Sequence, residues 1–204
     1  MLRVIQGWSQ NIQQDAALAL GCTRQALDID PDSVPALVSE GAVLTNLIHR
    51  LDEAEDRYDQ ALMYNPNESY GLVMRGILKA FQDRGKEGQK DTDLAIHLTP
   101  LDPHRFFYLS LGSGASLAAG DSKRAVELGQ SSLRLNRTHA STLRTLAVAY
   151  FRTGKQDSAR EMIEELLRQQ PSFSVNGWLK SAPSADFEVG KEFARDLLHL
   201  GVPA

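Results

Sequence analysis

Residues 140–171 read ASTLRTLAVAYFRTGKQDSAREMIEELLRQQP. Two runs in this stretch place apolar residues at the three- and four-residue spacing of one helix face. The first run carries Leu143, Leu146, Ala147 and Tyr150, and the second carries Ala159, Ile163 and Leu166. Gly154 separates the runs and Pro171 follows the second, and both residues are signals that end helices. The stretch therefore predicts a helical hairpin.

The ending of this hairpin recurs along the chain, with a pair such as Ala-Leu or Ser-Leu shortly before a turn. The endings are ALDIDP at 26–31, ALMYNP at 61–66, AIHLTP at 95–100, SLRLNR at 132–137 and LLRQQP at 166–171. They follow one another at steps of 34 to 37 residues. Proline lacks a backbone N–H and disfavours a helical residue before it, so these endings predict turns between units. We expect one array with units at about 1–31, 32–66, 67–100, 101–137 and 138–171.

The hairpin at 140–171 matches a known repeat pattern. Leu143, Leu146, Ala147 and Tyr150, then Ala159 and Ile163, then Pro171 follow the spacing W-x2-L-G-x2-Y, A-x3-F and P. The stretch therefore resembles a tetratricopeptide repeat, and the resemblance extends over about residues 1–171. It implies an all-α fold, a right-handed superhelical solenoid of about five helical hairpins. It also implies a scaffold that binds other molecules and carries out no chemistry of its own.

Two units depart from this pattern. In the third, Arg75 and Lys79 replace the expected leucine and tyrosine, and Gly88 stands where alanine is usual. Glycine costs up to about 1 kcal/mol relative to alanine within a helix, so we expect the helix at about 86–98 to be the weakest and locally mobile. In the first unit, Met1 stands about where a helix should begin, with no capping residue ahead of it. We therefore expect a fragment, whose preceding element has been removed or lies in another chain.

The period stops after Pro171. Residues 172–180 predict a short helix, and residues 186–200 predict a last helix that Gly201 and Pro203 end. A repeat array needs a terminal element that covers the apolar face of its last unit. We therefore expect residues 172–204 to form a C-terminal cap within the same domain.

Composition indicates which kinds of partner and which cellular compartment the sequence favours. The 204 residues have a net charge of −4, with both signs interspersed and no basic run, which argues against contact with nucleic acid. The sequence has no apolar stretch of membrane-spanning length and no signal peptide pattern, so we expect no membrane contact. The single cysteine, Cys22, cannot form an internal disulfide, and we expect it to be a buried small side chain in a reducing, cytoplasmic compartment.

No set of residues in the sequence converges on a catalytic or cofactor site. None of the five histidines is paired at the four-residue spacing that places two metal ligands on one helix face. Residues 110–114, SLGSG, lack the order of a nucleophile elbow, and we interpret them as small residues for helix packing. We therefore predict a protein that is not an enzyme, without catalytic residues, cofactor or metal. A helical hydrolase or transferase with a pocket near Phe106 and Phe107 is the least favoured alternative.

In tetratricopeptide arrays the first helix of each unit lines a concave groove, and the resemblance places residues of this chain there. They are Val4 and Trp8, then Ser39, Val43 and Asn46, then Tyr70, Val73, Ile77 and Phe81, then Phe107, Ser110 and Leu117, and lastly Arg144, Val148, Phe151 and Arg152. The lysine, arginine and asparagine with which some relatives clamp a peptide carboxylate are replaced, since Val4, Val43, Val73 and Ile77 stand there. A mostly apolar groove suits a helix or peptide of a partner protein, or a second copy of the chain. Coverage by the chain's own C-terminal helix is an equal alternative.

Several short strings carry a narrower resemblance. They are Gly7-Trp8, the segment from Ala95 to Pro103, SSLRLN at 131–136 and LLHLGVP at 197–203. These strings resemble the C-terminal region of bacterial signalling proteins in which an adenylate or guanylate cyclase domain, or a winged-helix transcription regulator domain, precedes the repeats. The resemblance implies a regulatory, protein-binding module of signal transduction. The alternative is a standalone cytoplasmic adaptor that binds a peptide or helix of a partner.

Overall fold

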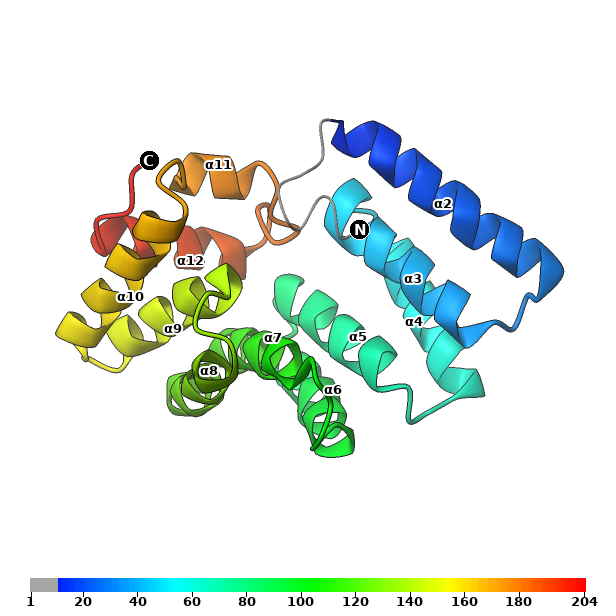
Figure 1. Cartoon of the computed structure of the whole chain (residues 1–204), viewed down its shortest axis with the longest axis horizontal. Helices are drawn as coiled ribbons and strands as arrows, with labels where there is room; N and C mark the ends of the chain where they lie inside the picture. Colours follow the sequence, from blue (N-terminus) through cyan, green and yellow to red (C-terminus); the bar gives the residue numbers. More distant parts are fainter. Residues whose placement is uncertain (1–10) are drawn as a thin grey trace.

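The computed structural model describes residues 11–204, and every regular element in this part of the chain is a helix (Figure 1). The elements are α2 (Ile12–Ile29), α3 (Val34–Val43), η1 (Leu44–Ile48), α4 (Leu51–Tyr64), α5 (Ser69–Phe81), α6 (Gly85–Leu98), α7 (Arg105–Ala118), α8 (Ser122–Leu135), α9 (Ala140–Arg152), α10 (Gln156–Gln169), α11 (Val175–Leu179) and α12 (Glu188–His199). None of the helices in residues 11–204 combines the length and the apolar character that crossing a membrane requires.

Successive helices pair as hairpins. The pairs are α3 and η1 with α4, α5 with α6, α7 with α8, and α9 with α10. The first helices also contact one another in the order α3, α5, α7 and α9, so the hairpins stack side by side into a solenoid (Figure 1). The predicted all-α solenoid of helical hairpins is confirmed.

Three of the turns that follow second helices use the same hydrogen-bond pattern. The residues Asp30, Asn65 and Asn136 each leave the helix in an extended conformation, and the side chain of each accepts a hydrogen bond from the backbone N–H two residues later. Such turns satisfy the backbone locally and stop the helix. The fourth unit has Arg137 where the others have proline, but Asn136 makes the same turn as Asn65. The proline is therefore dispensable at this position.

A close crossing explains the unusual Gly88 in the second helix of the third hairpin. A Cβ atom at Gly88 would lie 2.3 Å from the carbonyl oxygen of Gly76, and one at Gly76 would lie 2.8 Å from that of Gly88. Two glycines facing each other let the backbones of α5 and α6 approach more closely than any other pair of residues allows. Gly88 is therefore a packing residue.

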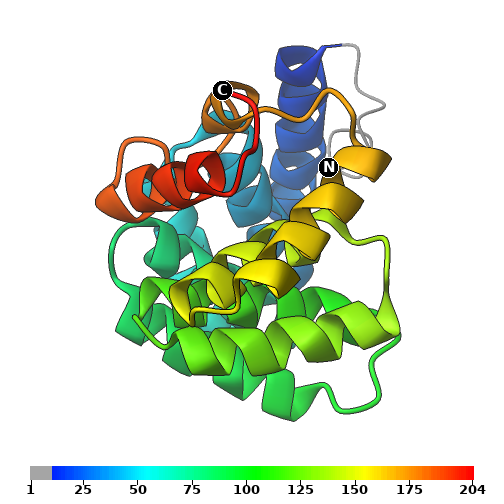
Figure 2. The same cartoon turned by 90° about the vertical axis from the view of Figure 1, so that its left-hand side faces the viewer.

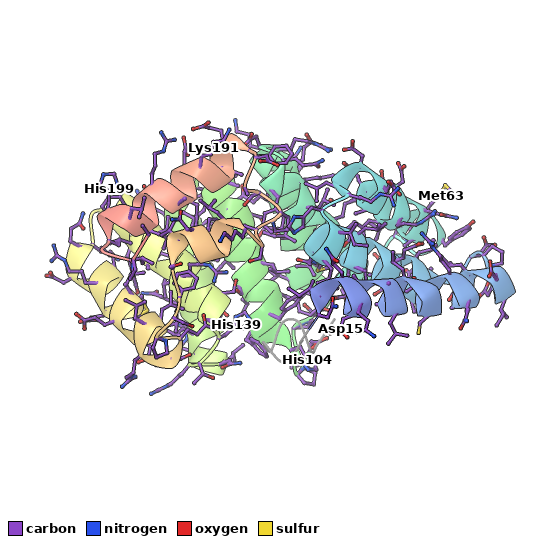
Figure 3. The ribbon with its side chains drawn as sticks, turned by 90° about the horizontal axis from the view of Figure 1, so that it is seen from above. Asp15, Met63, His104, His139, Lys191 and His199 are labelled. Carbon is purple, nitrogen blue, oxygen red and sulfur yellow. The ribbon has the colours of Figure 1, made fainter. Side chains whose placement is uncertain are left out.

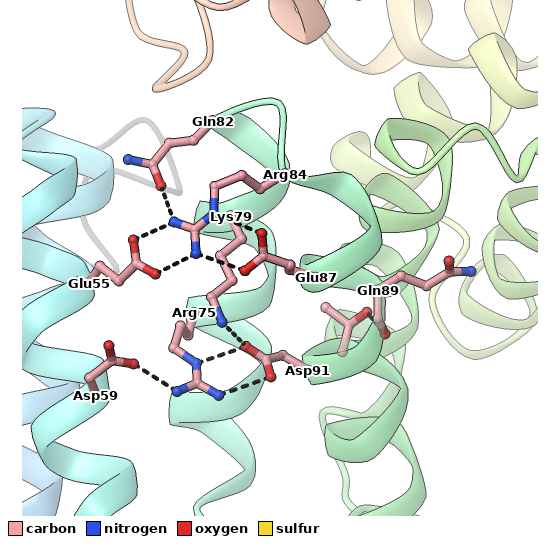
Figure 4. Close-up of polar contacts among 10 residues, drawn as sticks. Glu55, Asp59, Arg75, Lys79, Gln82, Arg84, Glu87, Gln89 and Asp91 are labelled. Atoms are coloured by element: carbon pink, nitrogen blue, oxygen red, sulfur yellow. Dashed lines mark hydrogen bonds and ion pairs between the residues drawn. The ribbon is translucent and has the colours of Figure 1, made fainter.

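Charged residues in the third hairpin replace the apolar pair of the repeat pattern. Asp91 of α6 accepts two hydrogen bonds from the Arg75 guanidinium, at 2.7 and 2.9 Å, and one from Lys79 Nζ at 3.0 Å. Arg75 also donates to Asp59 of α4 at 2.7 Å (Figure 4). The two cations are thus paired by acids from both neighbouring helices, and they tie α4, α5 and α6 together.

Two local expectations differ from the structure. Helical spacing predicts a helix up to about Ile48, but α3 ends at Val43 and a π-helical turn, η1, follows. There Thr45 Oγ1 donates to the Gly41 carbonyl oxygen and lies 3.1 Å from the Tyr58 hydroxyl, so a buried polar contact accompanies the altered turn. The prediction that Cys22 is buried is wrong, because it is exposed on α2.

The C-terminal segment, residues 172–204, folds back over the array (Figures 1 and 2). Helix α12 contacts both α9 and α5. Its first N–H groups are capped from a distance, since the Asp83 carboxylate in the turn after α5 accepts hydrogen bonds from Glu188 N at 3.1 Å and Val189 N at 2.7 Å. The segment therefore covers the last hairpin and also spans to the third.

Candidate functional site: the concave face and its cavity

Some of the residues expected in the groove are buried. Val43, Val73 and Val148 are almost fully inaccessible and pack within the hydrophobic core. Such side chains stabilise the hairpins and leave almost no surface for a partner. Val4 and Trp8 lie outside the described residues.

The C-terminal segment covers the groove at the fifth hairpin. The Phe151 ring is stacked on the His199 ring with centroids 6.1 Å apart, and Arg152 Nε lies 2.6 Å from Asp196 Oδ2. Both partners belong to α12. Of the two alternatives left open by the sequence, self-coverage therefore holds for this end of the array.

Other expected groove residues keep exposed surface. Asn46, Tyr70, Phe81 and Phe107 are half-buried, and Ser39 is exposed. Tyr70 and Phe107 come from the adjacent first helices α5 and α7, and their ring centroids lie 6.2 Å apart. Burial raises the pKa of the Tyr70 hydroxyl, so this aromatic pair is neutral in the physiological range.

A cavity of about 780 Å³ lies between the first helices and the C-terminal segment. Ile77, Phe81, Leu111 and Leu117 line it from α5 and α7, and Phe173, Trp178, Val189 and Phe193 line it from the C-terminal segment. Among the described residues, its only charged lining side chains are Arg144 and Arg152. The cavity is therefore apolar over most of its wall and positive at the α9 side.

Arg144 differs from Arg152 in having no acidic partner. No hydrogen bond or ion pair joins its guanidinium to any residue from 11 to 204, and residues 1–10 contain no Asp or Glu. Its guanidinium carbon instead lies 5.7 Å from the ring centroid of Phe173 and 5.8 Å from that of Trp178. Burial lowers the pKa of Arg144 to about 10, which still leaves it charged at neutral pH. Aromatic rings attract a cation but accept few of its N–H groups, so these donors remain available.

Ser110 is the second unusual polar group of the cavity wall. It is 1% exposed, and within the described chain its Oγ atom is buried without a hydrogen-bond partner. Ser110 and Arg144 lie 34 residues apart in the first helices α7 and α9, which pack side by side. The repeat therefore brings the two groups to equivalent positions on neighbouring helices.

Sequence reasoning missed the aromatic side of the cavity. Phe173, Trp178 and Phe193 belong to the non-repeating end of the chain, where helical spacing predicted only a cap. Trp178 and Phe193 pack with ring centroids 5.1 Å apart. Their aromatic character was visible in the sequence, but no spacing rule relates them to α9.

The metal-ligand and nucleophile candidates of the sequence are dispersed among the described residues. No group of three or more His, Cys, Asp or Glu side chains in residues 11–204 is placed to hold a metal ion. His139 and His199 lie well apart in Figure 3, and His139 Nδ1 contacts Thr142 Oγ1 at 2.8 Å. In the SLGSG stretch, Ser113 Oγ donates to the Ala125 carbonyl oxygen at 2.7 Å, which links α7 to α8.

Solved structures with the same architecture support this assignment of the fold. PilF of Pseudomonas aeruginosa is 22% identical, with a TM-score of 0.67, over 97% of this chain and 87% of that one. PilW, a type IV pilus biogenesis factor, is 19% identical, with a TM-score of 0.70, over 92% and 86%. YrrB, described as a tetratricopeptide repeat protein with an unusual peptide-binding site, is 15% identical, with a TM-score of 0.57, over 87% and 89%.

Comparison by sequence matches a smaller part of the chain than comparison by structure does. No curated protein matches this chain. A tetratricopeptide repeat family model matches residues 116–175, from the end of α7 to the start of α11. The chain thus contains a recognisable tetratricopeptide repeat, set in a solenoid with the fold of tetratricopeptide repeat proteins.

Proposed function

We propose that this chain is a non-catalytic protein-interaction module that holds a segment of a partner protein on its concave face. The observation that carries the proposal is the partly exposed aromatic pair Tyr70 and Phe107 on adjacent first helices. Aromatic side chains bury a large apolar area at low conformational cost and dominate many interfaces. The partner segment lies along α3 and the first turns of α5 and α7, which carry Tyr70 and Phe107, because the C-terminal segment covers α9 and contacts α5.

The similar structures support this proposal only through their fold. YrrB has a peptide-binding site, and PilW acts in pilus biogenesis, as they are described. A fold by itself does not determine function, so the proposal depends on the aromatic pair.

Site-specific crosslinking tests the proposal. A photoreactive benzoylphenylalanine placed at Tyr70 or Phe107 is expected to crosslink one partner segment in the source cells, identified by mass spectrometry. Leu94, which is exposed on the second helix α6, provides the matched control position. The purified partner should then bind the parent chain, and binding should weaken at least tenfold when Tyr70 and Phe107 are both alanine. That loss corresponds to about 1.4 kcal/mol or more.

Two outcomes would contradict the proposal. Crosslinking at Leu94 with none at Tyr70 and Phe107 would place the interface on the outer helices. Crosslinks between two copies of the chain would identify self-association in place of a separate partner.

We further propose, on the sequence resemblance alone, that the module serves a bacterial signalling protein with a cyclase or transcription regulator domain. The alternative is a standalone cytoplasmic adaptor. The mass of the native polypeptide separates these two. A mass far above the 22.5 kDa of this sequence, with peptides of a cyclase or winged-helix domain, is the expected result. A mass near 22.5 kDa would favour the adaptor.

A further inference from the structure

We propose that the cavity beneath the C-terminal segment binds a small carboxylic acid with an apolar body. Arg144 pairs with the carboxylate, Ser110 donates a hydrogen bond to it, and the apolar wall holds the rest of the molecule. This inference goes beyond the proposed partner site, because its ligand is a small molecule and its residues lie on the covered half of the concave face.

The size and lining of the cavity fit such a ligand. Pockets that bind small molecules usually measure about 300 to 1,000 Å³ and combine apolar walls with a few convergent polar groups. This cavity measures about 780 Å³, and Ile77, Phe81, Leu117 and Phe193 contribute to its apolar wall. A molecule the size of octanoate or 3-phenylpropionate would fit within this volume, with its apolar body against this wall.

The charged side chains that line the cavity favour an anionic ligand. Arg152 is neutralised by Asp196 of α12. Arg144 pairs with no carboxylate among the described residues, and residues 1–10 contain no Asp or Glu. A guanidinium presents N–H donors in a planar fork that matches a carboxylate. The Phe173 and Trp178 rings hold the guanidinium in place, and its donors remain for a ligand.

Ser110 gives an independent indication of the same ligand. A buried hydroxyl without a partner costs free energy, and such groups in native structures call for an explanation. Ser110 borders the cavity on the helix next to Arg144, and in the proposed complex its hydroxyl donates a hydrogen bond to the ligand carboxylate. The pair differs from the peptide clamp of some tetratricopeptide proteins, whose positions hold valine and isoleucine here.

Calorimetric titration with chosen probes tests the proposal. The probes are octanoate and 3-phenylpropionate, with octanamide and 3-phenylpropionamide as uncharged controls of the same shape. The parent chain should bind at least one acid and should bind its amide at least tenfold more weakly. Arg144→Met and Ser110→Ala should each weaken binding of the acid, the first by at least tenfold. Arg137→Met removes an exposed arginine of the preceding turn and should leave binding unchanged.

A second variant blocks the cavity and leaves the Arg144 charge in place. Gly114 of α7 lines the cavity, and a Cβ placed on it meets only the Ile77 Cδ1 atom, at 3.2 Å. Gly114→Leu would fill the cavity without touching the charge, and leucine favours a helix over glycine. This variant should lose binding of the acid while keeping its helical circular dichroism spectrum.

Several results would overturn the proposal. They are no binding of either acid, equal binding of acid and amide, and undiminished binding to Arg144→Met or Gly114→Leu. A peptide ending in leucine with a free carboxylate forms a separate arm, with its amidated form as control. Binding of this peptide without binding of the small acids would assign the cavity to the C-terminus of a partner chain and reject a small ligand. Crosslinking at Tyr70 is unaffected by these results, so the two proposals can fail separately.

Discussion

The third and fifth hairpins treat an arginine of their first helix in opposite ways. Arg75 of α5 meets two acids, Asp59 and Asp91, whereas Arg144 of α9 meets two aromatic rings and no acid. Both side chains are partly buried. An arginine that stabilises the fold is expected to have its charge neutralised, because desolvating an unpaired charge is costly. The contrast favours a scaffold role for Arg75, and it is the basis on which a binding role is proposed for Arg144.

The largest expected effect comes from removing the acid of the third hairpin. Asp91→Ala should lower the free energy of unfolding by about 3 to 5 kcal/mol, because Lys79 loses its acidic partner and Arg75 keeps only Asp59. Arg144→Met should change it by less than about 1 kcal/mol in either direction, because no ion pair is lost. Denaturation with urea measures both variants. Equal losses of stability would remove the distinction between the two arginines.

A smaller effect is expected from acid pH at the start of the fifth hairpin. Burial, and secondarily the Arg144 charge, lower the pKa of His139 to about 4. The unfolded chain binds a proton below about pH 6.5 while the folded chain resists it, so stability should fall as the pH drops from about 6.5 to 4. The contribution is up to about 3 kcal/mol. His139→Asn should flatten this part of the stability profile, whereas the exposed His97→Gln should not.

The glycine crossing of the third hairpin should be next in size. Gly88→Ala should destabilise the chain by about 2 kcal/mol, because the new methyl group would meet the Gly76 carbonyl oxygen. Gly21→Ala on α2 is the matched control, since a Cβ there meets nothing within 4 Å. The control should gain up to about 1 kcal/mol from helix propensity. If Gly88→Ala also gained stability, the third hairpin would tolerate the usual residue and the crossing would be looser than described.

The smallest effect should come from the contact that joins the two regions. Asp83→Ala removes the cap of α12 and should cost about 1 kcal/mol, because two backbone N–H groups lose their acceptor. Amide hydrogen exchange should accelerate mainly within residues 188–199. Asp83 has a positive φ of 62°, so Asp83→Gly relieves backbone strain while losing the cap and separates the two contributions. Unchanged exchange in both variants would mean that the contacts of α12 with α9, such as Phe151 with His199 and Arg152 with Asp196, suffice to hold the C-terminal segment.

The sequence predicted the helices well because their signals are local. Apolar residues at helical spacing, followed by Pro66 or Gly154, specify a helix and its end within a few residues of chain. The same signals did not show that η1 is a π-helical turn, in which Thr45 contacts Tyr58 of another helix. The exposure of Cys22 was also missed, because its spacing does not reveal how little of α2 is covered.

The residues of the candidate site also differ in how far the sequence could predict them. The repeat by itself determined that Ser110, Arg144 and Arg152 belong to the first helices, because a period of about 34 residues assigns each a position. Only the tertiary structure decided that Val73 is buried, that Arg152 is neutralised by Asp196, and that Phe173 and Trp178 lie beside Arg144. Helical periodicity depends on residues that are neighbours in the chain. The path of the C-terminal segment depends instead on contacts with distant parts of the array, including the hydrogen bond that Glu188 N donates to Asp83, more than 100 residues earlier.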